Sequence, residues 1–152
     1  MSELSTPTKL SADIVNADEG LSYIEKFLQA KTWYLSTIDA DGFPYSRPMS
    51  LLIRHEDSLY FATAKGKDMV RHIEANPHVG IYAAIHGAGK MRIRAYAHAC
   101  YSDDLAQKFF EYHPRHYQRY VGEDPHQAQF FKLEKLCVEY MANYKNYTII
   151  CA

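Results

Sequence analysis

The order of strand-like runs and turn signals is the feature that most constrains the fold of this chain. Aromatic and β-branched runs that predict strands cover residues 32–38, 44–54, 58–63, 79–85, 90–101 and 136–150. Turn signals such as Asp39-Ala40-Asp41-Gly42 separate neighbouring runs, and a single short helix interrupts them before Asn76-Pro77. A doubly wound parallel sheet would need regular alternation of strands and helices. We therefore predict an α+β or mostly β fold, an antiparallel barrel or strongly curved sheet with short helices appended.

The helical segments are fewer than the strands. Apolar residues at helical spacing predict an amphipathic helix within residues 17–31. Asp68 is the expected cap of a second helix that ends at Ala75 and buries Met69, Val70 and Ile73. Helical signals dominate residues 102–133, where the packed face is expected to consist of Leu105, Ala106, Phe109 and Phe110.

Two predicted strands have informative patterns. The run 90–101 alternates most cleanly: Met91, Ile93, Ala95, Ala97 and Ala99 face one way, and Arg92, Arg94, Tyr96 and His98 face the other. The run 44–54 contains Pro48, which cannot donate to a strand ladder, so this strand should have an edge, a bulge or a ligand at that position.

Length and composition bound the function classes. The 152 residues, 47% apolar and 23% charged, suit one domain over 17–152 preceded by a flexible, polar N-terminal arm over 1–16. The net charge of −1 argues against nucleic-acid or anionic-membrane partners, and the scattered histidines do not predict a metal site. Neither a signal peptide nor an apolar run of membrane-spanning length is present, so we predict a cytoplasmic protein whose three cysteines are reduced.

One cluster of residues could carry chemistry. A hairpin between the second and third strands would bring Arg47 close to Thr63 and to Lys65 and Lys67 in the following loop. Cations beside backbone N–H groups at a helix start favour a phosphate. The plainer alternative is a solvated lysine turn with a surface arginine, and a capping carboxylate at Asp68 would weaken a phosphate site.

Four segments of the chain resemble the pyridoxamine 5′-phosphate oxidase-like, FMN-binding split-barrel superfamily. They are LSTIDADGFPYSRPMSLLI, SLYFATAKGKDMVRHIEANPHVGIY, KMRIRAYAHACYSDD and, more weakly, FFKLEKLCVEY. The resemblance covers residues 28–147 and is similar in kind to small, nitroimidazole-resistance-like members. It implies an antiparallel split β-barrel, FMN as cofactor, and a homodimer with the flavin at its interface.

The resemblance also assigns roles to residues. It implies FMN phosphate contacts from Arg47 and Lys67, with Lys65 assisting. It implies ring contacts from Pro48, Met49 and Ser50, and a border to the ring and ribityl chain from Phe61, Ala62 and Thr63. Met91 and Arg92 would face the flavin of the partner subunit, although a merely solvated barrel wall explains the basic side of that strand equally well.

The resemblance is incomplete in places that bear on activity. Genuine pyridoxamine phosphate oxidases carry a longer C-terminal segment with substrate-binding arginines, so we do not expect that activity here. They also carry an Arg-Lys pair where this chain has Asp68 and Met69, and nitroimidazole-resistance members have a histidine where this chain has Ala62.

Two functions follow as expectations. The first is an FMN-dependent oxidoreductase that passes electrons from a reductant to a small organic substrate. The alternative is a non-enzymatic flavin or haem binder in electron transfer or storage. The catalytic acid or base is unassigned, because His98, Tyr96 and Tyr140 are equivalent candidates.

Overall fold

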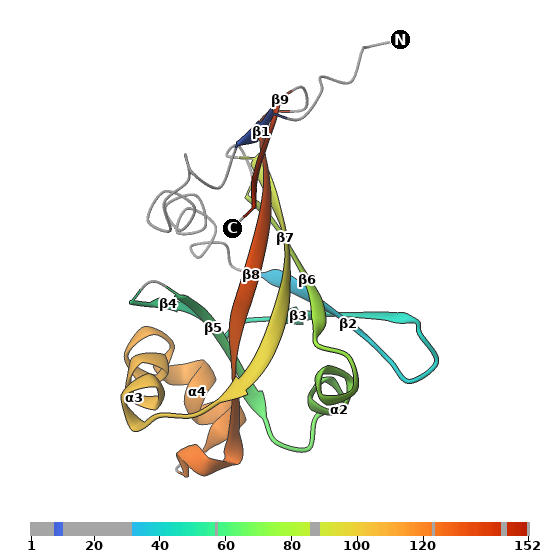
Figure 1. Cartoon of the computed structure of the whole chain (residues 1–152). Coiled ribbons are helices and arrows are strands. Elements are labelled where there is room, and N and C mark those ends of the chain that lie inside the picture. Colours follow the sequence, from blue (N-terminus) through green and yellow to red (C-terminus); the bar gives the residue numbers. More distant parts are fainter. Residues whose placement is uncertain are drawn as a thin grey trace.

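The structure is a computed structural model that describes residues 8–10, 32–56, 58–85, 89–122, 124–143 and 146–151 (Figure 1). Within these residues, nine strands form one sheet, bordered by three α-helices and a short 3-10 helix at Pro125–Gln127. The strands are β1 Thr8–Leu10, β2 Trp33–Ile38, β3 Pro44–Met49, β4 Leu52–His55, β5 Ser58–Ala64, β6 His78–Ile85, β7 Gly89–Cys100, β8 Ala128–Asn143 and β9 Asn146–Cys151. The helices are α2 Asp68–Ala75, α3 Asp103–Tyr112 and α4 Pro114–Val121.

The sheet is an antiparallel split barrel, as predicted. One path runs in the order β1-β9-β8-β7-β6-β2-β3, while β5 pairs with both β8 and β4. Every described strand pair is antiparallel except β1 with β9. Strands β3 and β4 therefore lie at opposite ends of the curled sheet, although only Ser50 and Leu51 separate them in the sequence.

The prediction of a single strand over 44–54 is wrong, because the chain breaks at Ser50 and Leu51. Strand β3 pairs with β2 alone, with Pro48 opposite Tyr34, so the proline lies on an edge strand where its missing N–H costs no ladder bond. The chain then leaves this edge, and β4 pairs with β5, with Leu52 opposite Phe61. The break at Ser50 and Leu51 is the split in the barrel.

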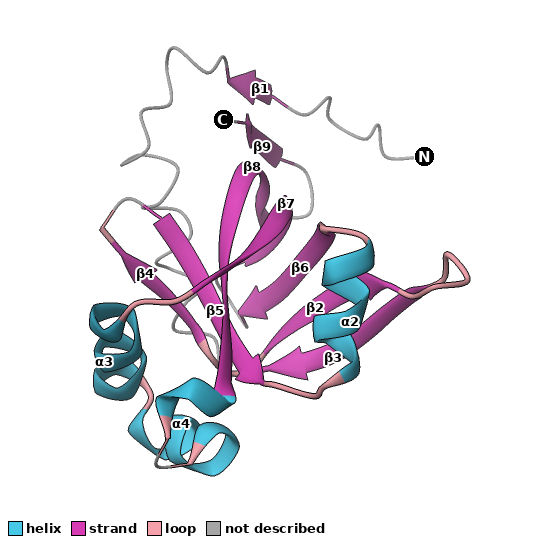
Figure 2. Cartoon of the chain, turned by 60° about the horizontal axis from the view of Figure 1, so that its bottom comes forward, coloured by secondary structure: helices cyan, strands magenta, loops and turns pink. Residues whose placement is uncertain are grey.

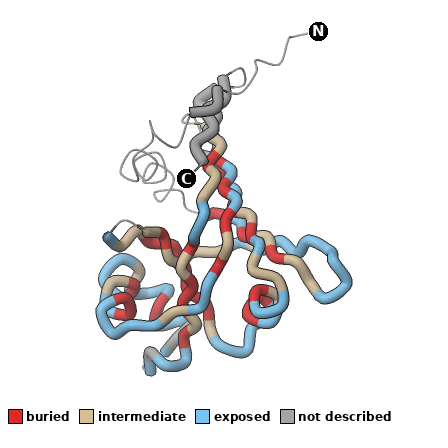
Figure 3. The backbone as a smooth tube through the Cα atoms, in the orientation of Figure 1, coloured by how far each residue is buried: buried red, intermediate tan, exposed pale blue. Residues whose placement is uncertain are grey.

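Two apolar clusters lie on opposite sides of the β5–β8 wall. The barrel cluster includes Phe61 and Phe131, whose rings stack at 5.0 Å between centroids, and α2 covers it with its predicted apolar face. The second cluster includes Ala62 and Phe130, and α3 and α4 cover it. Figure 2 shows α2 on one side of the molecule and α3 and α4 on the other, and Figure 3 shows buried residues along the strands between them and within these helices.

The helical interpretation of residues 128–133 is wrong, because β8 begins at Ala128. Phe130 and Phe131 are both buried, one in each cluster. Successive residues of a strand face opposite sides, so a strand between two cores buries both neighbours. Phe110, predicted on the packed face of α3, is 39% exposed. The alternation predicted for β7 holds from Met91 to Ala97, whereas Ala99 is exposed.

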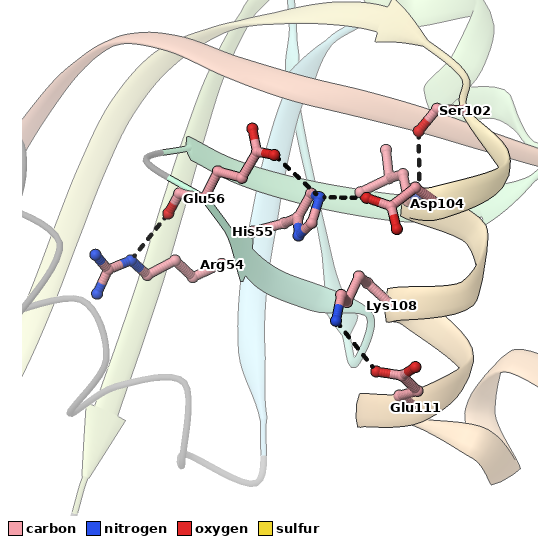
Figure 4. A network of polar contacts seen from close by, with 8 residues as sticks. Arg54, His55, Glu56, Ser102, Asp104, Lys108 and Glu111 are labelled. Atoms are coloured by element: carbon pink, nitrogen blue, oxygen red, sulfur yellow. Dashed lines mark hydrogen bonds and ion pairs between the residues drawn. The ribbon is translucent and has the colours of Figure 1, made fainter.

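A polar contact joins helix α3 to the β4–β5 hairpin (Figure 4). In the first turn of the helix, the Asp104 carboxylate lies 2.9 Å from His55 Nε2 at the end of β4. Ser102 caps the same end of the helix by accepting a hydrogen bond from the Leu105 N–H at 3.0 Å.

His113, between α3 and α4, makes folding stability depend on pH. Its Nε2 lies 3.3 Å from the Leu52 carbonyl oxygen. Burial lowers the pKa of the imidazole most strongly. The contact with the carbonyl raises this pKa, and the nearby His116 lowers it by a smaller amount, so the net shift is downward. A histidine with a lowered pKa binds fewer protons when folded, so its contribution to stability is present above the ordinary pKa and is lost as the pH falls below about 6.5.

We therefore expect His113→Gln to flatten the loss of stability between pH 7.5 and 5.5 relative to the unsubstituted protein. Urea unfolding at both pH values measures the effect, with His78→Gln on β6 as an exposed control. An equally steep loss in the His113 variant would contradict this assignment.

Some predictions concern the ends of the chain. The helix predicted within residues 17–31 lies outside the described residues, and Thr8–Leu10, within the predicted arm, form β1. The prediction of reduced cysteines is wrong for Cys137, which is disulfide-bonded; the antiparallel register of β8 and β9 places it opposite Cys151, a proximity that sequence spacing does not reveal. Cys100 is free. In the described part of the chain, no helix is long and apolar enough to span a membrane.

Candidate functional site

A cavity of about 200 Å³ lies at the split of the barrel. It is formed where β3 ends, where β5 ends and where α2 begins, three places that Figure 2 shows close together. Its lining consists of Arg47, Pro48, Met49, Ser50, Leu51, Ala62, Thr63, Lys67 and Met69. The cavity thus joins a cationic end to an apolar wall.

The structure brings together most of the residues singled out from the sequence, but by a different geometry. We expected a hairpin between the strands carrying Arg47 and Thr63, whereas β3 and β5 are not paired. They approach each other because the chain leaves β3 at Ser50 and Leu51 and continues as β4, which pairs with β5. At this point the Ala62 N–H of β5 donates to the Leu51 carbonyl at 3.1 Å. The unpaired edges leave room for the cavity.

Four of the proposed site residues lie outside the lining of this cavity. Phe61 points into the barrel cluster, because successive residues of β5 face opposite sides, and Met91 is buried there too. Lys65 is exposed in the turn after β5. Arg92 lies on the outer face of the sheet, where its Nη1 is 3.3 Å from Glu139 Oε2.

The Arg47 side chain is held by several contacts with its neighbours. Its Nη2 donates to Thr37 Oγ1 at 3.0 Å, and the guanidinium carbon lies 4.9 Å from the centroid of the Tyr45 ring. Its Nη1 is buried and has no hydrogen-bond partner among the described residues. Burial lowers the pKa of the guanidinium, while Tyr45 and Asp68 act in the opposite direction, and an arginine remains cationic at neutral pH.

A buried donor without a partner is costly, so Arg47 Nη1 identifies where an acceptor would be most favourable. Because this donor belongs to a cation in the lining of the cavity, an anionic acceptor fits it best.

Lys67 is the second cation of the cavity, and the start of α2 differs from the prediction. Lys67, not Asp68, is the N-cap residue, and it makes no side-chain capping bond. Asp68 instead forms an ion pair with Arg71 one turn along the helix. The first N–H groups of α2 are therefore not occupied by the carboxylate that was expected to compete with a phosphate.

The remaining lining is apolar except for Ser50 and Thr63, and its apolar part comes from both clusters. Met49 and Met69 belong to the barrel cluster, and Leu51 and Ala62 to the second one. Such a wall suits a flat, largely apolar ring whose polar edge meets the backbone near Pro48. No group of three or more metal-ligating side chains occurs in the described part of the chain.

Sequence reasoning missed the residues that lie beside and behind the cations. Leu51 and Met69 line the cavity. Thr37 contacts Arg47 directly, and His72 contacts Thr37. The strict alternation of Trp33, Leu35 and Thr37 in β2 could have indicated that Thr37 points inward, since all three are buried. No comparable sequence pattern pointed to His72.

Comparison with known proteins identifies one matching family. The family described as "Pyridoxamine 5′-phosphate oxidase" matches residues 23–142. No match is found among curated protein sequences.

Several solved structures share the fold. A NimC/NimA family protein from Clostridium acetobutylicum superposes with a TM-score of 0.78 at 18% identity, covering 88% of this chain and 93% of the other. General Stress Protein 26 from Bacillus anthracis gives 0.65 at 23% identity, covering 79% and 92%. HutZ from Vibrio cholerae, described as a heme storage protein, gives 0.58 at 18% identity, covering 74% and 87%.

Proposed function

The chain belongs to the pyridoxamine 5′-phosphate oxidase family, and from its cavity we propose that it is an FMN-binding flavoprotein. We further propose that it acts as an oxidoreductase, transferring electrons from a reductant to a small organic acceptor. The buried Nη1 of Arg47, which lacks a partner within the described residues, is the observation that carries the proposal.

The lining residues suit the parts of FMN. Arg47 and Lys67 would hold the phosphate, because two cations and uncapped helix N–H groups favour a dianion. The backbone of Pro48, Met49 and Ser50 would border the isoalloxazine ring, with Ala62 and Thr63 beside the ribityl chain. When bound, the flavin supplies the hydride and electron chemistry, and the chain's own residues bind it, orient it and exclude water.

The size of the cavity supports a homodimer. Ligand pockets usually measure roughly 300–1,000 Å³, and the cavity of one chain measures about 200 Å³. A second copy that covers the open side would complete the site. Met91 is 2% exposed and belongs to the barrel cluster, so the proposal does not use it as a contact with the partner. Arg92, exposed on the outer face of the sheet, keeps its proposed role toward the partner's flavin.

Haem binding is the second candidate, because one structural neighbour is described as a heme storage protein. Haem iron is usually held by histidine, cysteine, methionine or tyrosine. The lining of the cavity offers Met49 and Met69 but none of the other three residue types. The cations, and a lining without histidine, cysteine or tyrosine, favour the flavin over haem.

The proposal is tested by the purified protein titrated with FMN. We expect quenching of flavin fluorescence at a stoichiometric end point, an increase in melting temperature, and bleaching of the visible flavin bands on addition of a reduced nicotinamide with reoxidation by a small quinone. Protein that stays colourless and gains no thermal stability would refute flavin binding. Stable flavin binding without turnover would refute the enzymatic part alone, and preferential uptake of haem would favour the alternative.

Lys67 and Lys65 provide a matched pair for the phosphate contact. Lys67 lines the cavity, and Lys65, two residues earlier in the same turn, does not. We expect Lys67→Ala to weaken FMN binding about tenfold, as loss of a charge-assisted hydrogen bond worth roughly 1.5–3 kcal/mol implies. We expect Lys65→Ala to weaken it less than threefold, through long-range charge alone. Fluorescence titration measures both; equal losses would mean that general positive charge, not contact, holds the phosphate.

A further inference from the structure

We propose that Thr37 and His72 are positioning residues that hold Arg47 in the orientation required to bind the phosphate. This inference rests on the proposed function and adds two residues to it, neither of which lines the cavity. It begins from a continuous chain of hydrogen bonds: Arg47 Nη2 to Thr37 Oγ1 at 3.0 Å, and Thr37 Oγ1 to His72 Nδ1 at 2.8 Å.

The chemistry of the groups fixes the direction of the first hydrogen bond. A guanidinium can only donate, so Thr37 Oγ1 accepts from Arg47. The hydroxyl retains its proton and a second lone pair, and with these it serves either tautomer of His72 at Nδ1. We call this chain from Arg47 through Thr37 to His72 the relay.

Groups from a strand, a helix and an aromatic ring surround the relay. Thr37 is 1% exposed in the interior row of β2, and His72 belongs to α2, where its ring meets Tyr45 edge-on at 5.5 Å. The Tyr45 ring in turn lies against the Arg47 guanidinium. These contacts use Nη2 and the face of the guanidinium, whereas the buried Nη1 has no partner among the described residues and is the donor that an anion would satisfy.

Positioning of this kind matters because Arg47 lies on an edge strand. A free arginine side chain loses considerable rotamer entropy when it is immobilised by a ligand. If Thr37 immobilises it beforehand, the phosphate binds without that loss. The benefit applies only to ligands that use Arg47, and it should disappear for a flavin without a phosphate.

The test compares FMN with riboflavin. We expect Thr37→Val to weaken FMN binding roughly three- to tenfold, since one rotamer-rich side chain must then be ordered on binding. Riboflavin affinity should be unchanged, and Thr37→Ser, which retains the hydroxyl, should restore FMN affinity. In an Arg47→Ala background, Thr37→Val should cause no further loss, because the two residues act through one contact.

His72→Phe provides a second variant, because it retains a ring against Tyr45 and removes Nδ1; it should weaken FMN binding in the same selective manner. Equal losses of FMN and riboflavin affinity in both variants would overturn the inference by showing a general structural role. Unchanged FMN affinity in both variants would overturn it as well, while leaving the proposed function intact. Absence of FMN binding by the unsubstituted protein would instead refute the proposed function, and this inference with it.

Discussion

Arg47→Ala is expected to lower the affinity for FMN by at least tenfold and to leave the fold intact. The side chain lines the cavity and carries one buried donor without a partner among the described residues, and a charge-assisted hydrogen bond to a phosphate contributes roughly 1.5–3 kcal/mol. That range corresponds to losses of about 10- to 150-fold. Because Arg47 is only partly buried, its removal should change the free energy of unfolding little.

Fluorescence titration with FMN and with riboflavin measures this effect and assigns it to the phosphate. Arg47→Ala should make the two affinities converge. Arg115→Ala is the matched control, because it removes an exposed arginine from α4, on the side of the molecule away from α2. FMN affinity equal to that of the unsubstituted protein would place the phosphate elsewhere.

Phe131→Ala is expected to destabilise the protein by about 3–5 kcal/mol, the usual result of truncating a fully buried aromatic side chain. Phe131 is 1% exposed and stacks on Phe61 in the barrel cluster, and its strand pairs with both β5 and β7. The truncation therefore leaves a cavity in the wall that joins the two halves of the barrel.

Phe110→Ala is the control for this second prediction, because Phe110 is 39% exposed on α3. It should cost less than about 1 kcal/mol, as partly exposed positions usually do. Guanidinium unfolding of both variants measures the difference. Similar losses at the two positions would contradict the burial described here and would support the prediction that Phe110 lies on the packed face of its helix.

Local patterns predicted much of this fold, because those elements are determined locally. Helix α2 ends at Ala75 as expected, since Asn76-Pro77 stops it and its apolar face is short and regular; it begins one residue earlier than expected, at Asp68. The alternation in β7 follows directly from its inward and outward rows up to Ala97. The error over residues 128–133 has a physical cause: a strand buried on both sides has no alternation, so Phe130-Phe131 could not be distinguished from a helical apolar face.

Most residues that line the cavity were predictable from the sequence, but the geometry that brings them together was not. Arg47, Lys67 and the segment 48–50 stand out as a phosphate-type cluster because of their charges and the ladder-breaking proline. That β3 and β5 approach without pairing depends on the closure of the whole barrel, which no local pattern encodes. The contact of Thr37 with His72 joins residues 35 positions apart and is likewise a product of tertiary packing.

A crystal structure of the protein reconstituted with FMN would test the central claim most directly. We predict a phosphate oxygen within hydrogen-bonding distance of Arg47 Nη1, a second one near Lys67, and the isoalloxazine ring along Pro48–Ser50. A phosphate bound on another face of the molecule, with Nη1 of Arg47 contacting only solvent, would contradict the account.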